Sequence, residues 1–255
     1  MNRIRVVTAA ALFDGHDVSI NIFRKLLQKK GIEVIHLGHN HAVKEIVTVA
    51  LQEDADAILI SSYQGGHNEF FRYAVDSFKE LSIGNVLIFG GGGGVILPAE
   101  IMELEAYGVE KIYHASDGQK MGINGIVDDI IARINRKKDS STDNGLQDIG
   151  AAQVASLNVS AHLNIAKQIT FIENNLQAGD GSAAYKKLYA AHDQKKSLVL
   201  GVTGTGGSGK SSLIDELINR FLKITSAFHI GVLTIIQPEG FPAEPCSVTA
   251  FASII

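Results

Sequence analysis

The sequence predicts an α/β fold whose first part is a doubly wound parallel sheet. Short apolar runs alternate with helical patterns from residue 3 to about residue 136, and strands separated by helices of this length form parallel βαβ units. Glycine clusters fall at strand-to-helix turns. Of the 255 residues, 45% are hydrophobic, which is enough to bury a core. Five strands in this arrangement favour the flavodoxin-like strand order.

The elements follow from where the apolar periodicity starts and stops. The first strand covers residues 3–10 and stops before Asp14-Gly15, a turn signal, and an amphipathic helical pattern follows. Pro98 suits an early helical position. The expected strands are residues 3–10, 33–37, 57–61, 86–89 and 111–113, and the expected helices are residues 17–30, 42–53, 68–81, 98–106 and 122–136.

Asp14 and His16 lie in the loop after the first strand. That loop is at the carboxyl edge of the sheet, where open α/β folds bind ligands. A neutral imidazole gives one nitrogen to a metal, and Asp14 can fix the tautomer by accepting a hydrogen bond from the other. The alternative is a capping loop with a surface histidine, because Asp caps helices readily.

The loops after the third and fourth strands reach the same edge. They contain Ser61, Ser62 and the glycine run of residues 90–94. Because glycines carry no side chain, a large planar or chain-like ligand could approach the backbone closely there. Strand-end hydrogen bonding by the serines and a flexible glycine loop are the simpler alternatives. No glycine-rich phosphate cradle or G-x-G-x-x-G follows the first strand, which disfavours flavin and dinucleotide ligands.

Composition excludes several classes of function. The net charge of −4 argues against a nucleic-acid partner. The single cysteine, Cys246, fits a reducing cytoplasm. No signal peptide or membrane span is recognisable, so we expect a cytoplasmic protein without a membrane partner.

Residues 137–196 are expected to link two domains. The segment 137–150 is polar, 151 to about 176 is helical, and 183–192 is a possible further helix. A second α/β unit begins at residue 197, with strands at 198–203 and 230–235. The composition of the sequence changes after Ile236, and residues 250–255 show no pattern that predicts a pairing strand. A truncation or shifted reading frame would explain this change. In the linker helix the expected buried positions are Leu157, His162, Ile165, Ile169 and Ile172.

Residues 204–211 fit G-x-x-x-x-G-K-[ST] at every position, between a strand and a helix that runs to about residue 222. Backbone N–H groups would cradle phosphates, Lys210 would reach the β- and γ-phosphates, and the Ser211 hydroxyl would ligate Mg²⁺. The alternative is a chance glycine-rich turn. No later hydrolytic segment follows, so we expect weak nucleotide binding without efficient turnover. The expected nucleotide site is Gly204, Gly206, Gly207, Ser208, Gly209, Lys210, Ser211 and Ser212.

Three motifs carry a resemblance to a known family. Asp14-x-His16, Ser61-x-Tyr63 and Gly93-Gly94-Val95-Ile96 together resemble the cobalamin-binding domain of adenosylcobalamin-dependent acyl-CoA mutases. The added P-loop unit resembles the fused isobutyryl-CoA mutases, which continue into a mutase barrel. Ser19 stands where the family has Gly, and Tyr63 where it has Leu, which affects packing of the cofactor's nucleotide tail.

The resemblance implies that His16 is the lower cobalt ligand, oriented by Asp14. It implies domains at 1–136 (cobalamin), 137–196 (linker) and 197–255 (start of a P-loop GTPase). The cofactors would be adenosylcobalamin and GTP with Mg²⁺. The partner would be an acyl-CoA barrel, in a complete protein that forms a homodimer. No catalytic residue is expected in this chain, and we expect it to be inactive alone. The expected cofactor-binding residues are Asp14, Gly15, His16, Asp17, Ser61, Ser62, Tyr63, Gly91, Gly92, Gly93 and Gly94.

Alternatives stay open at this point. The chain could be a stand-alone cobalamin delivery or sensor module, or a corrinoid methyl carrier, although that class usually places a helical cap before the sheet. A nucleotide-dependent kinase or chaperone would use the first domain only as a scaffold.

Overall fold

The computed structural model describes residues 4–81, 86–140, 159–177, 198–205, 207–224, 230–234 and 250–254. The chain divides into two compact units, Met1–Gly181 and Ser182–Ile255. None of the described helices combines the length and apolar character needed to cross a membrane. The domain boundaries near residues 136 and 196 stay a prediction.

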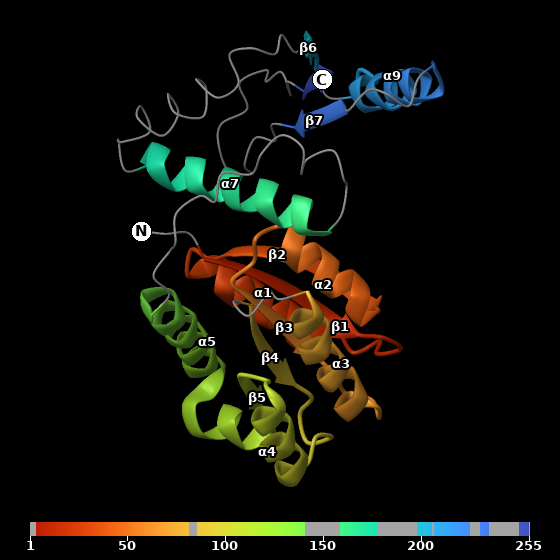
Figure 1. Cartoon of the computed structure of the whole chain (residues 1–255). Helices are drawn as coiled ribbons and strands as arrows, with labels where there is room; N and C mark the ends of the chain where they lie inside the picture. The colour runs from red at the N-terminus through yellow and green to blue at the C-terminus, as the bar shows by residue number, and fades with distance from the viewer. Residues whose placement is uncertain are drawn as a thin grey trace. The chain divides into compact units, whose positions relative to one another are not determined.

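The first unit contains the parallel sheet that the sequence predicts (Figure 1). Its strands run in the order β2-β1-β3-β4-β5, which confirms the flavodoxin-like order. Strands β1 and β3 are buried at every residue and are apolar except for Arg5, Thr8 and Ser61, as expected for a sheet covered on both faces. The strands are β1 (Arg5–Ala11), β2 (Glu33–His41), β3 (Ala57–Ser61), β4 (Leu87–Gly91) and β5 (Lys111–Tyr113).

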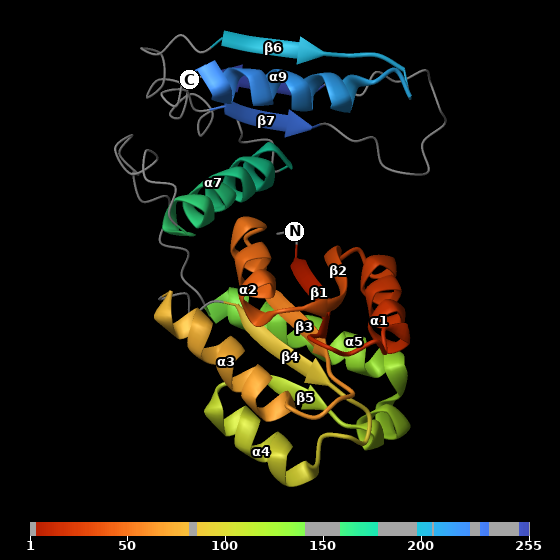
Figure 2. The ribbon, with the colours of Figure 1, turned by 90° about the vertical axis from the view of Figure 1, so that its right-hand side faces the viewer.

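Helices cover both faces of this sheet (Figure 2). α1 (Val18–Lys29) and α5 (Ala115–Ser140) share one buried apolar cluster with the sheet, whereas α2 (Val43–Gln52), α3 (His67–Glu80) and α4 (Pro98–Tyr107) share the other. α5 begins before the predicted residue 122 because two helical segments meet there, at Gly122 with a positive φ of 69°.

Helix α7 (Val159–Gln177) also belongs to the first unit, and here the predicted buried face is wrong. Ile165 and Ile169 are 43% and 50% exposed, whereas Ala166 is buried. The cause is Arg5, which is 7% exposed and donates hydrogen bonds to Thr170 Oγ1 and Glu173 Oε2. A buried guanidinium needs charged and polar partners, and Thr170 and Glu173 supply them. They lie on the side of α7 that also carries buried Ala166 and Leu163, which packs against the core. Leu157 and the side chains of His162 and Ile172 lie outside the described residues.

The second unit places a glycine-rich loop between a strand and a helix. Its elements are β6 (Leu198–Val202), α9 (Lys210–Ile224), β7 (Ile230–Thr234) and β8 (Ala250–Ile254). The prediction that the final segment has no partner is wrong. Strand β8 lies between β6 and β7 and is antiparallel to both. The helix predicted over residues 183–192 lies outside the described residues.

Candidate functional site

The carboxylate of Asp14 organises the loop that follows β1. It is only 1% exposed, and Oδ1 accepts hydrogen bonds from His16 N and His16 Nδ1, both at 2.9 Å. Oδ2 accepts a third from Tyr63 N at 2.5 Å, which joins the loops after β1 and β3. Burial by itself raises the pKa of Asp14, but these hydrogen bonds outweigh it and hold the pKa below its ordinary value.

His16 is held by one nitrogen and presents the other. Because ionised Asp14 accepts from Nδ1, the imidazole carries its proton there, and Nε2 keeps a free lone pair. The His16 side chain is 69% exposed. A fixed tautomer with an accessible second nitrogen is the arrangement that a metal-binding histidine requires.

The glycine run after β4 packs closely against the loop after β3. A Cβ added at Gly92 would lie 2.0 Å from the Ser62 carbonyl oxygen, and one at Gly93 would lie 2.8 Å from the Tyr63 ring. Gly93 also has a positive φ of 60°. The Tyr63 ring lies 5.7 Å from the His16 ring, between centroids. His16, Tyr63 and the glycine loop therefore form one continuous surface feature.

The other predicted residues lie around this feature with different exposures. Ser61 and Ser62 are buried, and the Ser61 hydroxyl lies 3.4 Å from the Ser19 hydroxyl. Gly15 has open space at its Cβ position, and the side chain of Asp17 makes no capping hydrogen bond to α1. At the other end of the glycine run, Gly91 closes β4, and a Cβ at Gly94 would meet nothing within 4 Å.

The structure adds residues that the sequence did not single out. Phe13 is 76% exposed with a positive φ of 65°, and its N–H donates to Asn40 Oδ1 at 3.2 Å. Asn40 has the same unusual φ. The other addition is His67, which contacts Glu100 across the loops after β3 and β4. No local pattern marks these residues, because their roles depend on contacts between loops distant in sequence.

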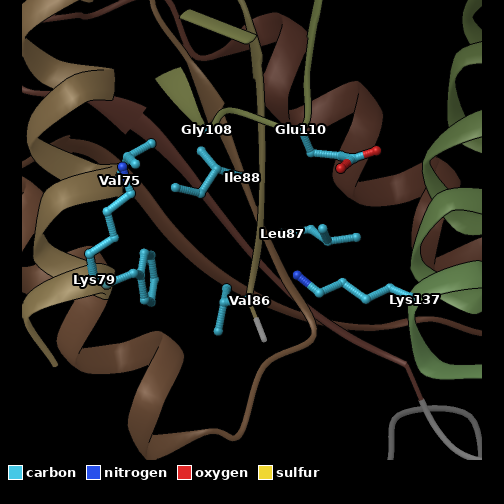
Figure 3. A pocket seen from close by; sticks show the side chains of 9 residues that line it. Val75, Lys79, Val86, Leu87, Ile88, Gly108, Glu110 and Lys137 are labelled. Carbon is cyan, nitrogen blue, oxygen red and sulfur yellow. The ribbon is translucent and has the colours of Figure 1, made fainter. Parts of the chain in front are cut away.

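A separate pocket of about 200 Å³ lies elsewhere in this unit (Figure 3). It is lined by the end of α3, the start of β4, the residues before β5 and the end of α5. Those positions define the amino edge of the sheet, so the pocket is on the opposite edge from His16. Its labelled polar side chains are Lys79, Glu110 and Lys137.

In the second unit, the loop after β6 has the shape of a phosphate cradle. Gly207 and Gly209 have positive φ values of 74° and 81°, and α9 begins at Lys210. Lys210 Nζ donates to the Thr205 carbonyl at 2.5 Å, and Ser208 Oγ donates to the same carbonyl at 2.8 Å. Ser211 and Ser212 are exposed in the first turn of α9, Gly204 precedes the cradle, and Gly206 lies outside the described residues.

Two family models match this chain. The family described as "B12 binding domain" matches residues 4–116. The family described as "Methylmalonyl Co-A mutase-associated GTPase MeaB" matches residues 165–240. The first unit thus carries a cobalamin-binding domain, and a GTPase-type nucleotide-binding segment follows it.

Some similar proteins match most of this chain and others match only part of it. A fused isobutyryl-CoA mutase of Cupriavidus metallidurans is 49% identical over 92% of this chain and 20% of its own length. The 2-hydroxyisobutanoyl-CoA mutase small subunit of Aquincola tertiaricarbonis is 30% identical over 38% of this chain and 69% of that subunit. A solved cobalamin-binding protein from Desulfitobacterium hafniense has a TM-score of 0.43 and 24% identity, over 52% of this chain and 59% of that one.

The chain belongs to the fused isobutyryl-CoA mutase family of cobalamin-binding proteins. It spans about a fifth of the length of the fused relatives that it matches.

Proposed function

We propose that this chain is the part of an isobutyryl-CoA mutase that binds adenosylcobalamin and GTP with Mg²⁺. The whole enzyme would interconvert isobutyryl-CoA and n-butyryl-CoA on an acyl-CoA barrel outside this chain. When bound, adenosylcobalamin supplies the radical chemistry of such a rearrangement through homolysis of its cobalt–carbon bond. The role of this chain is to hold and orient the cofactor, with domain boundaries near residues 136 and 196.

The Asp14–His16 pair is the observation that carries this proposal. His16 would bind cobalt through Nε2, because its Nδ1 is occupied by a carboxylate that has almost no exposure to solvent. A metal-binding histidine commonly donates its other nitrogen to a carboxylate in this way. The residues present therefore fit the cofactor that the family uses.

The glycine run supports a groove for the displaced nucleotide tail beside His16. Only glycine allows the backbone at residue 92 to lie against the Ser62 carbonyl, and the Tyr63 ring lies over Gly93. We assign Ser61, Ser62, Tyr63 and residues 91–94 to this groove. Tyr63 would shape its wall next to His16, where the family has a smaller leucine.

The exposed apolar residues at the same edge support a barrel partner. Phe13, Val95 and Leu97 are 76%, 41% and 57% exposed. Relatives of the first unit are named as small subunits of 2-hydroxyisobutanoyl-CoA mutase and pivalyl-CoA mutase, and a small subunit implies a larger partner. We infer that this edge faces the substrate-binding barrel.

Absorbance titration of the purified chain with adenosylcobalamin tests the cobalamin site. We expect the spectrum of cobalamin whose own dimethylbenzimidazole has been replaced by histidine, and its loss in His16→Ala. His39→Ala is the matched control, because His39 is an exposed histidine on the neighbouring strand β2. A wild-type spectrum with the cofactor's own base still attached, or no binding, would contradict the proposal.

Binding of a fluorescent GTP analogue tests the nucleotide site. Lys210→Ala should weaken binding about tenfold or more, since the lysine supplies the cation for the β- and γ-phosphates. Lys223→Ala, in the last turn of the same helix, is the control. Equal affinities of the two variants would refute the assignment. Adding a separately produced acyl-CoA barrel then distinguishes a mutase component from a cobalamin sensor, because only the former restores isomerisation.

A further inference from the structure

The end of β2 is irregular where it runs beside the loop that carries His16. The pairing of β2 with β1 changes register twice over the second half of β1. Gly38 and Asn40 have positive φ values of 88° and 65°. Bulges of this kind bend a strand and redirect a side chain, and they are frequent next to active sites. The side chain redirected here is that of Asn40.

Asn40 contacts the turn that precedes Asp14. Its Oδ1 accepts a hydrogen bond from the Phe13 N–H at 3.2 Å. Phe13 is the third residue of a turn that is closed by a hydrogen bond from Asp14 N to the Ala11 carbonyl at 3.0 Å. Because β2 and β3 flank β1 on opposite sides, Asn40 holds this loop from one side and the Tyr63 N–H holds it from the other.

The turn needs support because Phe13 has a backbone conformation that suits few residues. Its φ is +65°, and a positive φ at the third position of a turn usually requires glycine or asparagine. For a bulky side chain such as phenylalanine this conformation is strained. The phenyl group is 76% exposed, so burial of the ring does not offset the strain. The hydrogen bond to Asn40 therefore stabilises a conformation that Phe13 alone does not favour.

The conformation of Phe13 determines where Asp14 points. Asp14 follows Phe13 directly, and its carboxylate accepts hydrogen bonds from His16 N, His16 Nδ1 and Tyr63 N. Rotation of Phe13 to the negative φ that its side chain prefers would turn the backbone at Asp14 and break these bonds. An imidazole released from its carboxylate loses its fixed tautomer. A chain of contacts thus runs from Asn40 through Phe13 and Asp14 to the imidazole of His16.

We propose that Asn40 is a positioning residue for His16, which acts by holding the strained turn at Phe13 and so keeps Asp14 in place. Asn40 lies outside the motifs that define the cobalamin site. The effect on cofactor binding rests on the cobalamin site proposed above, whereas the effect on the imidazole of His16 does not. Because an apparent affinity falls with the fraction of molecules in the binding-competent conformation, loosening the turn weakens binding while every residue of that site is kept.

Asn40→Gly is the informative variant, because glycine keeps the positive φ of residue 40 and removes the acceptor. Asn40→Asp is the matched rescue, since aspartate keeps an oxygen acceptor and also tolerates this φ. His39→Ala, at the preceding exposed residue of β2, is the control. Asn40 is itself exposed, so we expect all three variants to fold.

The first measurement is nitrogen NMR of the histidine side chains in the full chain without cobalamin, which reports the tautomer of His16. In wild type we expect the proton on Nδ1, and in Asn40→Gly a mixture of tautomers. Hydrogen exchange of the His16 N–H should become about threefold to tenfold faster, the range expected for loss of one hydrogen bond. Affinity for adenosylcobalamin, measured by absorbance titration, should fall by a similar factor. Asn40→Asp and His39→Ala should match wild type in all three measurements.

A wild-type tautomer and wild-type hydrogen exchange at His16 in folded Asn40→Gly would overturn the inference. Equal losses in Asn40→Gly and Asn40→Asp would also overturn it, because the oxygen acceptor would then have no role. If the wild-type chain does not bind adenosylcobalamin through His16 while the changes in tautomer and exchange still occur, the cobalamin proposal fails and the positioning role of Asn40 stands.

Discussion

Asp14→Asn is the most informative single change in the first unit, because the two side chains are nearly identical in shape. The carboxylate accepts three N–H groups while 1% exposed. Asparagine has one acceptor oxygen, so keeping both bonds to His16 places an NH₂ group against Tyr63 N–H. One charge-assisted hydrogen bond is lost and one backbone donor is left unpaired. We expect the free energy of unfolding to fall by about 2–3 kcal/mol.

The same substitution should affect ligand binding more than stability. With an amide oxygen in place of the carboxylate on Nδ1, the imidazole is no longer made more basic by a charged partner, and loss of such a partner typically costs 10–100-fold in metal affinity, so we expect about that loss for adenosylcobalamin. Urea unfolding followed by circular dichroism gives the first quantity, and absorbance titration gives the second.

Asp17→Asn is the control for Asp14→Asn. It removes the same charge one residue beyond His16, where the side chain makes no capping hydrogen bond. Equal losses of affinity in the two variants would show that negative charge near His16 matters rather than the oriented hydrogen bonds. That result would refute the reasoning.

Three further changes test other parts of the first unit. Gly92→Ala should destabilise it by about 1–3 kcal/mol and abolish cobalamin binding, because the new Cβ would lie 2.0 Å from a carbonyl oxygen of the neighbouring loop; Gly94→Ala, with open space at that position, should leave stability unchanged. Glu173→Gln should speed amide hydrogen exchange in α7 about threefold to tenfold, as expected for losing about 1 kcal/mol of its ion pair with buried Arg5; unchanged exchange would show that α7 is held by its apolar contacts alone. Burial raises the pKa of Asp129, but hydrogen bonds from a tyrosine and an arginine outweigh it and lower the pKa. The contribution of Asp129 to stability is therefore present above pH 4 and is lost as pH falls through the lowered value. The stability difference between wild type and Asp129→Asn should be about 1–2 kcal/mol at pH 7 and shrink toward zero below that pKa, whereas a difference independent of pH would refute this account.

Where local sequence carried the information, the predictions were accurate to the residue. The strands at 57–61 and 111–113 have the predicted bounds, because a buried strand needs only a short apolar run ended by polar or glycine residues. The sheet order followed from the alternation of elements. The glycine-rich loop between β6 and α9 was equally readable, because its spacing reflects backbone conformations that only glycine adopts readily.

Predictions failed where a distant residue decided the outcome. The exposed Ile165 and Ile169 follow an ordinary apolar pattern, but Arg5, more than 150 residues away in sequence, bonds to Thr170 and Glu173, so the side of α7 that carries them faces inward. The segment 250–254 looked unpartnered because antiparallel pairing with β6 and β7 leaves no periodic signal in a five-residue strand.

The sequence by itself determined the doubly wound sheet, the edge at which its loops gather, and the pairing of Asp14 with His16, because these depend on periodicity and close spacing. Only the tertiary structure decided that Asp14 also holds Tyr63, that Gly92 lies against Ser62, and that Asn40 holds Phe13. Each of these depends on two segments that are brought within hydrogen-bonding distance by the parallel register of their strands, and no spacing along the chain records that distance.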